Sequence, residues 1–376
     1  MMVDKKFKRA YITHCDEIYA PIVDKMLETV KEFSDIPCIA YVLNSDLKLK
    51  NADLTIRFNV DIREGASFIK TPPNENKYIL RKTLKVYDIV TKKPNITLDC
   101  LNKYADHVVY LDGDSIATPK IDDLFNYVND NHPMFTQGIL KYMMLSGPSY
   151  DKYHPWGGSP YEYEDGKEII NSSRTLEAHV CKLLGVDGNF RRNKSWGYCQ
   201  TGYFSAIKSN IPFIKEWIGL CELDEIKNNH NKYAPFHEET LANVLLWKYK
   251  WNESMPLVYV NCNSPERVIE TYNANFDPNQ PVTQQSDSVW FKTPPRLEDV
   301  KVFHGEKRPE IVDKIVKEIK NQEALKTSKI LYVAQHLSTG GMPQFILKRI
   351  EALMSTDIDV RVIELSDYGP DFVVQK

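Results

Sequence analysis

Short apolar runs that alternate with helix-like segments constrain this chain more than any other feature. The run Val108–Leu111 has the pattern of a strand that is buried on both faces of a parallel sheet. Upstream, residues 9–15 and 37–44 read as strands, with a helix over residues 20–33 between them. Strand–helix–strand units of this kind predict a doubly wound α/β fold, with a mostly parallel sheet flanked by helices.

The rest of the chain continues this rhythm with two interruptions. Residues 147–166 and 261–297 are rich in turn-forming residues, and we expect irregular structure there. Further helices are expected over residues 76–93, 211–223, 237–250 and 308–328.

Charge, cysteine content and hydropathy exclude several classes of protein. The chain has 48 Lys and Arg against 51 Asp and Glu, so its formal charge of −3 gives no reason to expect nucleic acid as a partner. Seven cysteines without close pairs argue against a zinc knuckle and a complete disulfide framework. The sequence shows no membrane-spanning run and no signal peptide, so we expect a cytoplasmic protein.

Two aspartates directly follow the buried strand. Asp112 and Asp114 therefore lie at the carboxyl end of a strand, which is where open α/β sheets bind ligands. Two carboxylates there can share one divalent ion, which in turn can hold a diphosphate, although the pair could also cap the following turn. A second pair, Asp357 and Asp359, precedes a strand and is interpreted as a polar turn.

At this point the chain shows a resemblance to a known family. The segment VVYLDGDSIATPKIDDLF resembles the DxD strand of GT-A type glycosyltransferases, in the family of glycogenin and the bacterial lipopolysaccharide galactosyltransferases. The resemblance covers residues 8–308. It implies the Rossmann-like GT-A fold and a hexosyltransferase-like enzyme that moves a sugar from a nucleotide-sugar donor, most simply a UDP-sugar, to a hydroxyl of a glycan-type acceptor. Transfer with retention is implied.

The resemblance also implies a set of donor-binding residues. The segment YITHCDEIYA is similar to the family's first strand and loop, which contact the uridine, and the helix before the DxD strand supplies a basic contact. The donor-binding residues implied in this way are Thr13, His14, Cys15, Tyr19, Arg81 or Lys82, Asp112, Gly113, Gly202 and Lys307.

The closing motif VKVFHGEKRP supplies the rest of the implied metal site. It makes His304 the third ligand beside Asp112 and Asp114, while Lys307 touches the diphosphate. Two carboxylates and one imidazole suit Mn²⁺, or Mg²⁺, better than Zn²⁺. The tryptophan that follows the family's proline is missing here, and a partly buried histidine at a strand end is the alternative reading of His304.

Three further residues are candidates for the chemistry. Gln200, with Thr201 and Gly202, stands where the family has Asn-Ser-Gly. Glu238 or Glu239 matches the acidic residue beside the transferred sugar, and either could instead be an ordinary acidic first turn of a helix. An inverting reaction would need a carboxylate base, and these two glutamates could serve.

Two other functions also fit an apolar strand that ends in DxD. One is a phosphohydrolase of the haloacid dehalogenase type, which the two preceding strands disfavour. The other is a glycan-binding module that kept the fold and lost turnover.

The aromatic residues of the first irregular segment could stack on acceptor sugars or pack on their own domain. These residues are Tyr150, Tyr153, Trp156, Tyr161 and Tyr163.

The carboxyl-terminal segment has its own resemblance. HLSTGGMPQFILKRIEAL looks like the opening glycine loop and first helix of GT-B type glycosyltransferases, with Gly340 and Gly341 permitting the tight turn. We therefore expect a GT-A domain over residues 1–308, a linker helix over 309–328 and the truncated start of a GT-B-like domain over 329–376. If the natural chain continues past residue 376, we expect it to be a fusion of two transferases.

Overall fold

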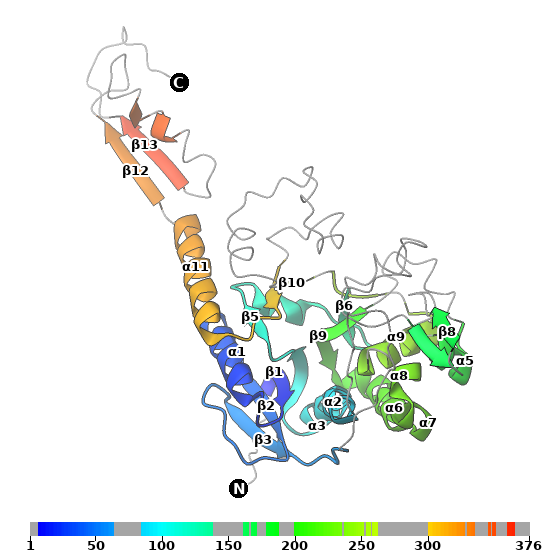
Figure 1. Cartoon of the computed structure of the whole chain (residues 1–376). Helices are drawn as coiled ribbons and strands as arrows, with labels where there is room; N and C mark the ends of the chain where they lie inside the picture. The colour runs from blue at the N-terminus through cyan, green and yellow to red at the C-terminus, as the bar shows by residue number, and fades with distance from the viewer. Residues whose placement is uncertain are drawn as a thin grey trace. The chain divides into compact units, whose positions relative to one another are not determined.

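A computed structural model provides the structure of the protein. It describes residues 7–63, 84–137, 161–164, 167–170, 178–187, 199–234, 237–251, 253–256, 258–261, 300–327, 329–334, 345–346, 348–350 and 359–364. The described part of the chain divides into two compact units that meet in sequence at Pro309. The first unit carries the DxD strand (Figure 1).

A six-stranded sheet forms the centre of the first unit, in the order β3-β2-β1-β4-β9-β6. Its first four strands are parallel, and β9 runs antiparallel to both β4 and β6. This mostly parallel sheet, flanked by helices, confirms the predicted α/β class. The strands are β1 (Phe7–Cys15), β2 (Cys38–Leu43), β3 (Leu54–Phe58), β4 (Ala105–Leu111), β6 (Met134–Gln137) and β9 (Cys199–Ile207).

Helices cover this sheet where the apolar faces need partners. Helix α1 packs on β1, while α3 packs on β1 and β4 and against α6, which in turn contacts α9. The helices are α1 (Ala20–Phe33), α2 (Leu84–Val90), α3 (Lys93–Lys103), α5 (Ala178–Leu184), α6 (Ile211–Glu222), α7 (Asp224–Asn228), α8 (His230–Tyr233) and α9 (Glu238–Lys248).

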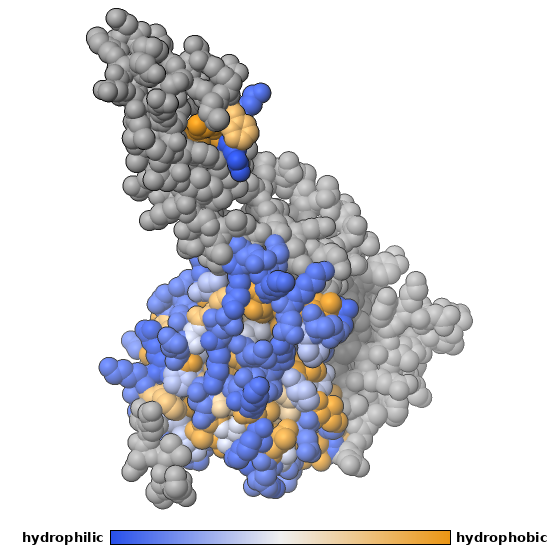
Figure 2. Space-filling view, turned by 90° about the vertical axis from the view of Figure 1, so that its left-hand side faces the viewer, coloured by the Kyte–Doolittle hydropathy of each residue, from blue (hydrophilic) through white to orange (hydrophobic). Residues whose placement is uncertain are grey.

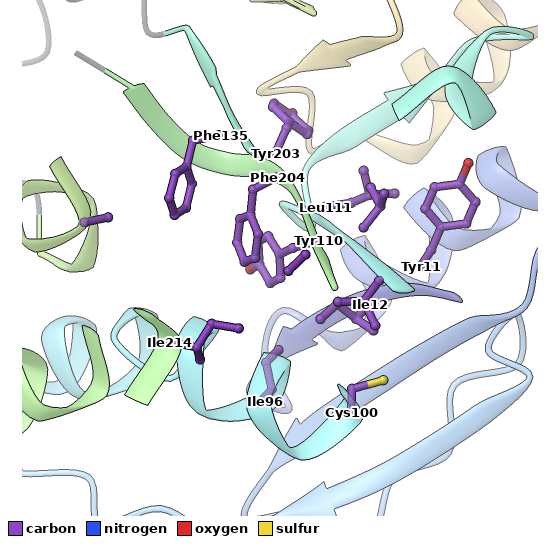
Figure 3. Close-up of a cluster of buried hydrophobic side chains, with 14 of the residues drawn as sticks. Tyr11, Ile12, Ile96, Cys100, Tyr110, Leu111, Phe135, Tyr203, Phe204 and Ile214 are labelled. Carbon is purple, nitrogen blue, oxygen red and sulfur yellow. The ribbon is translucent and has the colours of Figure 1, made fainter. Parts of the chain in front are cut away.

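Part of the hydrophobic core lies between β4, β9 and the helices α3 and α6 (Figure 3). The rings of Tyr110 and Phe204 stack at 5.2 Å across the β4–β9 pair, and Ile96 of α3 and Ile214 of α6 are fully buried beside them. Burial of such large side chains contributes about 1.5–3 kcal/mol each. The described cysteines are buried free thiols, as expected from their spacing.

A small second sheet brings a distant segment to the end of the DxD strand. It has the order β10 (Tyr259–Asn261), β11 (Val302–His304) and β5 (Ser115–Ala117). Strand β11 is antiparallel to β5, and this register sets His304 opposite Ser115. The 3-10 helix η1 (Ile121–Asn126) follows β5.

The second unit contains the helix expected near residues 308–328, which is α11 (Pro309–Thr327). It also contains a parallel pair, β12 (Lys329–Ala334) and β13 (Asp359–Glu364), in which Lys329 pairs with Asp359. Asp359 therefore begins a strand. Gly340 and Gly341 lie outside the described residues.

One helix prediction needs correction. The described end of the helix expected over residues 76–93 is only α2, and a separate helix, α3, begins at Lys93 with a proline in its first turn. Proline is favoured there because the missing N–H needs no partner at a helix start. The break at Thr91 and Lys92 therefore places Lys93 at a helix N-terminus.

Several predicted features fall on other parts of the chain. Tyr150, Tyr153 and Trp156 lie outside the described residues, and residues 161–164 form β7, which pairs with β8 (Lys167–Ile170). No helix in the described ranges is long and apolar enough to cross a membrane. On the face shown in Figure 2, the described residues are largely hydrophilic, with hydrophobic residues interspersed.

Candidate active site

The candidate site begins where β4 ends. Asp112 directly follows the strand, and its backbone N–H donates to the Gly202 carbonyl of β9 at 2.9 Å. Because β9 runs antiparallel to β4, the start of β9 lies beside the end of β4. Gln200, Thr201 and Gly202 are therefore brought to Asp112.

A buried lysine, Lys93, holds the first aspartate. Its Nζ lies 3.0 Å from Oδ1 of Asp112 and 2.9 Å from Oε1 of Glu238, and its side chain is only 9% exposed. Burial alone would lower the pKa of Lys93, but the two carboxylates raise it well above its ordinary value. Burial likewise opposes the charge of Asp112, but Lys93 brings the pKa of Asp112 below its ordinary value. The sequence interpretation missed this ion pair.

Glu238, the second carboxylate beside Lys93, makes a further hydrogen bond. Its Oε1 also accepts a hydrogen bond from Thr201 Oγ1 at 3.1 Å, and burial raises its pKa while Lys93 opposes that rise. The neighbouring Glu239 accepts the backbone N–H of Thr201 at 3.2 Å. Both glutamates therefore hold the start of β9, which adds a positioning role to the catalytic one predicted for them.

Gly202 makes room for two side chains of the site. A Cβ atom at this position would lie 2.4 Å from Oδ2 of Asp112 and 2.6 Å from Nε2 of Gln200. Gln200 folds back so that its Oε1 accepts the backbone N–H of Gly202 at 3.0 Å. Any larger residue here would displace the ends of the Asp112 and Gln200 side chains, because both lie against the Gly202 backbone.

The second aspartate faces the closing motif. Oδ1 of Asp114 lies 3.6 Å from Nδ1 of His304, and Oδ2 lies 3.7 Å from Nζ of Lys307. Gly305 has φ of +96°, and its N–H donates to the Asp114 carbonyl at 2.9 Å. This turn, which favours glycine, fixes His304 and Lys307 on either side of one carboxylate.

Lys307 also reaches the start of α1. Its Nζ lies 3.5 Å from the Tyr19 hydroxyl and 5.3 Å from the centre of the Tyr19 ring. Tyr19 is 46% exposed. Burial lowers the pKa of Lys307, but Asp114 and Tyr19 outweigh it and raise the pKa. Glu306 holds the preceding turn by accepting the N–H groups of Lys307 and Arg308.

Three residues predicted to contact the donor are turned into the protein. Thr13 is fully buried, and its Oγ1 has no hydrogen-bond partner among the residues that the structure describes. Burial raises the pKa of the Cys15 thiol to about 12. His14 donates from Nε2 to the Ile89 carbonyl and accepts at Nδ1 from the Tyr110 hydroxyl, both at 3.0 Å. Burial, followed by the Lys93 charge, lowers the pKa of His14 to about 4. Donor contacts from these residues stay a prediction.

Two further donor-binding predictions have different outcomes. A Cβ at Gly113 would lie 2.5 Å from Cγ2 of Val23, so this glycine lets α1 pass close to the DxD turn. Arg81 and Lys82 lie outside the described residues. The basic residue that the structure does place beside Asp112 is Lys93.

The candidate site contains side chains of the kinds that a divalent cation binds. Carboxylate oxygens and a neutral imidazole nitrogen are suitable ligands for Mn²⁺. Asp114 and His304 are close to each other, whereas Oδ1 of Asp112 faces Lys93. No group of three or more His, Cys, Asp and Glu side chains in the described part is arranged to hold a metal. The residues fit the ion in kind, and Asp112 would have to loosen its ion pair to join the other two.

Comparison with known proteins gives matches among solved structures alone, since no family model and no curated protein matches the chain. Three matching structures are glycosyltransferases. The bifunctional glycosyltransferase WbbM is 13% identical, with a TM-score of 0.46, and the match covers 85% of this chain and 50% of WbbM. This chain thus spans half the length of WbbM.

The other two structures are covered almost completely. The galactosyltransferase LgtC, solved with donor and acceptor sugar analogues, is 10% identical over 83% of this chain and 95% of its own, with a TM-score of 0.41. Mouse xyloside xylosyltransferase 1 is 7% identical over 80% and 97%, with a TM-score of 0.40.

Proposed function

We propose that this protein is a glycosyltransferase that moves a sugar from a nucleotide-sugar donor, a UDP-sugar, to a hydroxyl of a glycan-type acceptor with the help of Mn²⁺ or Mg²⁺. The observation that carries the proposal is the meeting of Asp114, His304 and Lys307 beside Asp112 at the end of β4. The two aspartates are far in sequence from His304 and Lys307, and together these residues offer acidic, imidazole and ammonium groups suited to a metal–diphosphate.

Each group has a defined part in the proposed reaction. Asp114, His304 and, after loosening from Lys93, Asp112 would hold the cation, which when bound would neutralise the charge that grows on the departing diphosphate. Lys307 would place a second positive charge beside the phosphates, and the exposed ring of Tyr19 would contact the uracil of the donor. Gln200 would face the sugar from the start of β9.

We propose that transfer occurs with retention. An inverting reaction needs a carboxylate that is free to take the acceptor proton. Glu238 is ion-paired with Lys93 and bonded to Thr201, and Glu239 accepts the Thr201 N–H, so both candidate bases already serve the protein framework. The anomeric configuration of the product, measured by ¹H NMR during turnover, tests this assignment.

We propose that the transferase domain is followed by two further segments of the chain. Residues 1–308 would form the transferase domain, 309–328 the linker helix and 329–376 the start of a GT-B-like domain. The parallel pair of β12 and β13 is compatible with such a start.

Calorimetric titration of UDP tests the donor and the metal together. We expect binding in the presence of Mn²⁺ that is lost on chelation, and at least a tenfold weaker affinity in Asp114→Asn. Asp46→Asn is the matched control, because Asp46 pairs with Arg57 at an exposed site with 81% side-chain exposure. Absence of UDP binding in both conditions would contradict the proposal. Release of phosphate from phosphomonoesters would instead favour the phosphohydrolase. Binding of glycans without turnover would favour the glycan-binding module that kept the fold and lost turnover.

A further inference from the structure

Three polar side chains from three strands form a hydrogen-bonded chain next to the DxD turn. The hydroxyl of Tyr203, on β9, lies 2.8 Å from Nδ1 of His304 on β11 and 2.8 Å from Oγ of Ser115 on β5. Ser115 Oγ in turn lies 2.6 Å from the Asp112 carbonyl oxygen. Tyr203 is fully buried, so its hydroxyl depends on these partners.

The direction of each of these hydrogen bonds follows from the Asp112 carbonyl oxygen at one end of the series. A carbonyl oxygen accepts only, so the hydroxyl proton of Ser115 is committed to Asp112. Ser115 then has no proton left for Tyr203, and the Tyr203 hydroxyl must donate to Ser115 Oγ. The Tyr203 oxygen can consequently only accept from His304, which requires a proton on Nδ1 of the imidazole.

We propose that Tyr203 is a positioning residue that, through Ser115, keeps neutral His304 protonated at Nδ1 and so places the lone pair of the imidazole on Nε2. This deepens the proposed function and rests on it for the use of that lone pair, which would bind the divalent cation. The tautomer itself follows from the hydrogen bonds alone. A metal-bound histidine is commonly oriented in this way by a partner on its other nitrogen.

Independent features of the site support the same tautomer. Oδ1 of Asp114, which can only accept while ionised, lies 3.6 Å from the same Nδ1 and favours a proton there. The rings of Tyr203 and His304 meet at 5.7 Å in a T-shaped arrangement of 87°, so packing as well as hydrogen bonding fixes the imidazole. The positive φ of Gly305 completes the constraint directly after His304.

Long-range ¹H–¹⁵N correlation spectra of histidine-labelled protein read the tautomer directly, with the metal absent and the imidazole neutral. A His304→Asn variant assigns the signal. We expect the Nδ1–H pattern in the wild type and a shift toward Nε2–H in Ser115→Ala, because Tyr203 is then free to donate to Nδ1. Tyr203→Phe should also lose the strict Nδ1–H preference.

Tyr41→Phe is the matched control. Tyr41 is an equally buried tyrosine of the same sheet, and its hydroxyl donates to Asp99 at 3.0 Å, away from the site. Its variant should keep the wild-type tautomer of His304. An Nε2–H pattern in the wild type, or a pattern unchanged in both Ser115→Ala and Tyr203→Phe, would overturn the proposal.

Binding of Mn²⁺, followed by the electron paramagnetic resonance signal of the free ion, gives the second readout. We expect Ser115→Ala and Tyr203→Phe to weaken Mn²⁺ binding by roughly tenfold and Tyr41→Phe to leave it unchanged. Equal Mn²⁺ affinity in all four proteins would overturn the positioning role. If the wild type shows the Nδ1–H tautomer but binds no Mn²⁺, the proposed metal-dependent function fails while the assignment of the tautomer stands.

Discussion

Lys93 and Glu238 form an ion pair of 2.9 Å inside the first unit, and Asp112 shares the same ammonium group at 3.0 Å. One buried cation therefore compensates the buried carboxylate of Glu238 and the half-buried carboxylate of Asp112, which come from different parts of the chain. A charge in such surroundings is tolerated only while its partners are present. This arrangement ties the stability of the fold to the candidate site.

Replacing Lys93 by Met should lower the free energy of unfolding by about 3–5 kcal/mol, because two carboxylates are left without a cation. Urea unfolding followed by circular dichroism measures the change. Adding Glu238→Gln to Lys93→Met should recover part of the loss. Lys103→Met is the control, since Lys103 pairs with Asp99 at 60% exposure and should matter by less than about 1 kcal/mol. Equal losses in both lysine variants would refute the network.

Gly202→Ala should disturb the site more than the fold. The new methyl group would displace the ends of the Asp112 and Gln200 side chains, so we expect a loss of stability below roughly 2 kcal/mol but about tenfold weaker UDP binding with Mn²⁺. Calorimetry measures the affinity of the variant and of the wild type for UDP with Mn²⁺. Gly219→Ala, in α6 with no atom within 4 Å of the new Cβ, should bind UDP normally and be up to about 1 kcal/mol more stable.

Gly305→Ala tests the turn after His304. Its φ of +96° should make alanine cost roughly 1–3 kcal/mol, and the shift of the turn should weaken Mn²⁺ binding. Gly185 provides a comparison, because its φ of +65° also disfavours alanine and it lies at the end of α5, outside the site. Both variants should lower the melting temperature. Weaker Mn²⁺ binding in Gly185→Ala as well would show that the effect is not local.

The depressed pKa of His14 predicts loss of stability in acid. Above pH 6.5 the imidazole is neutral in both states, whereas at lower pH the unfolded chain binds a proton that folded His14 refuses down to about 4. The difference between 6.5 and about 4 corresponds to roughly 3 kcal/mol lost across this interval. Urea midpoints measured from about pH 7.5 to 4.5 should fall less steeply in His14→Asn. The same slope in both proteins would contradict the assignment.

Much of the fold could be predicted from local pattern. Strands β1, β2 and β4 and helices α1, α6 and α9 are readable because their apolar spacing is strong. The antiparallel direction of β9 was not readable, because the direction in which a strand enters a sheet is decided by its connections and by packing.

Parts of the site were hidden for a similar reason. Lys93 stands in the polar stretch TKKPN, which reads as the solvated end of the helix expected over residues 76–93, and only the folded chain shows that Asp112 and Glu238 surround it. Tyr203 belongs to the apolar run GYFSA and reads as an ordinary core residue. Its hydroxyl matters because β5 and β11 bring Ser115 and His304 to it. No local spacing encodes such partners.

The short sheet that pairs β5 with β11 also has a consequence for folding. Tyr203 and His304, which are 101 positions apart, meet only after β4, β9 and β11 have all been aligned. Contacts this distant in sequence form late and slowly, since the entropy of closing long loops must be overcome first. The candidate site should therefore be absent from partly folded chains during synthesis, and a nascent chain could gain affinity for metal and nucleotide only after the segment around His304 has left the ribosome.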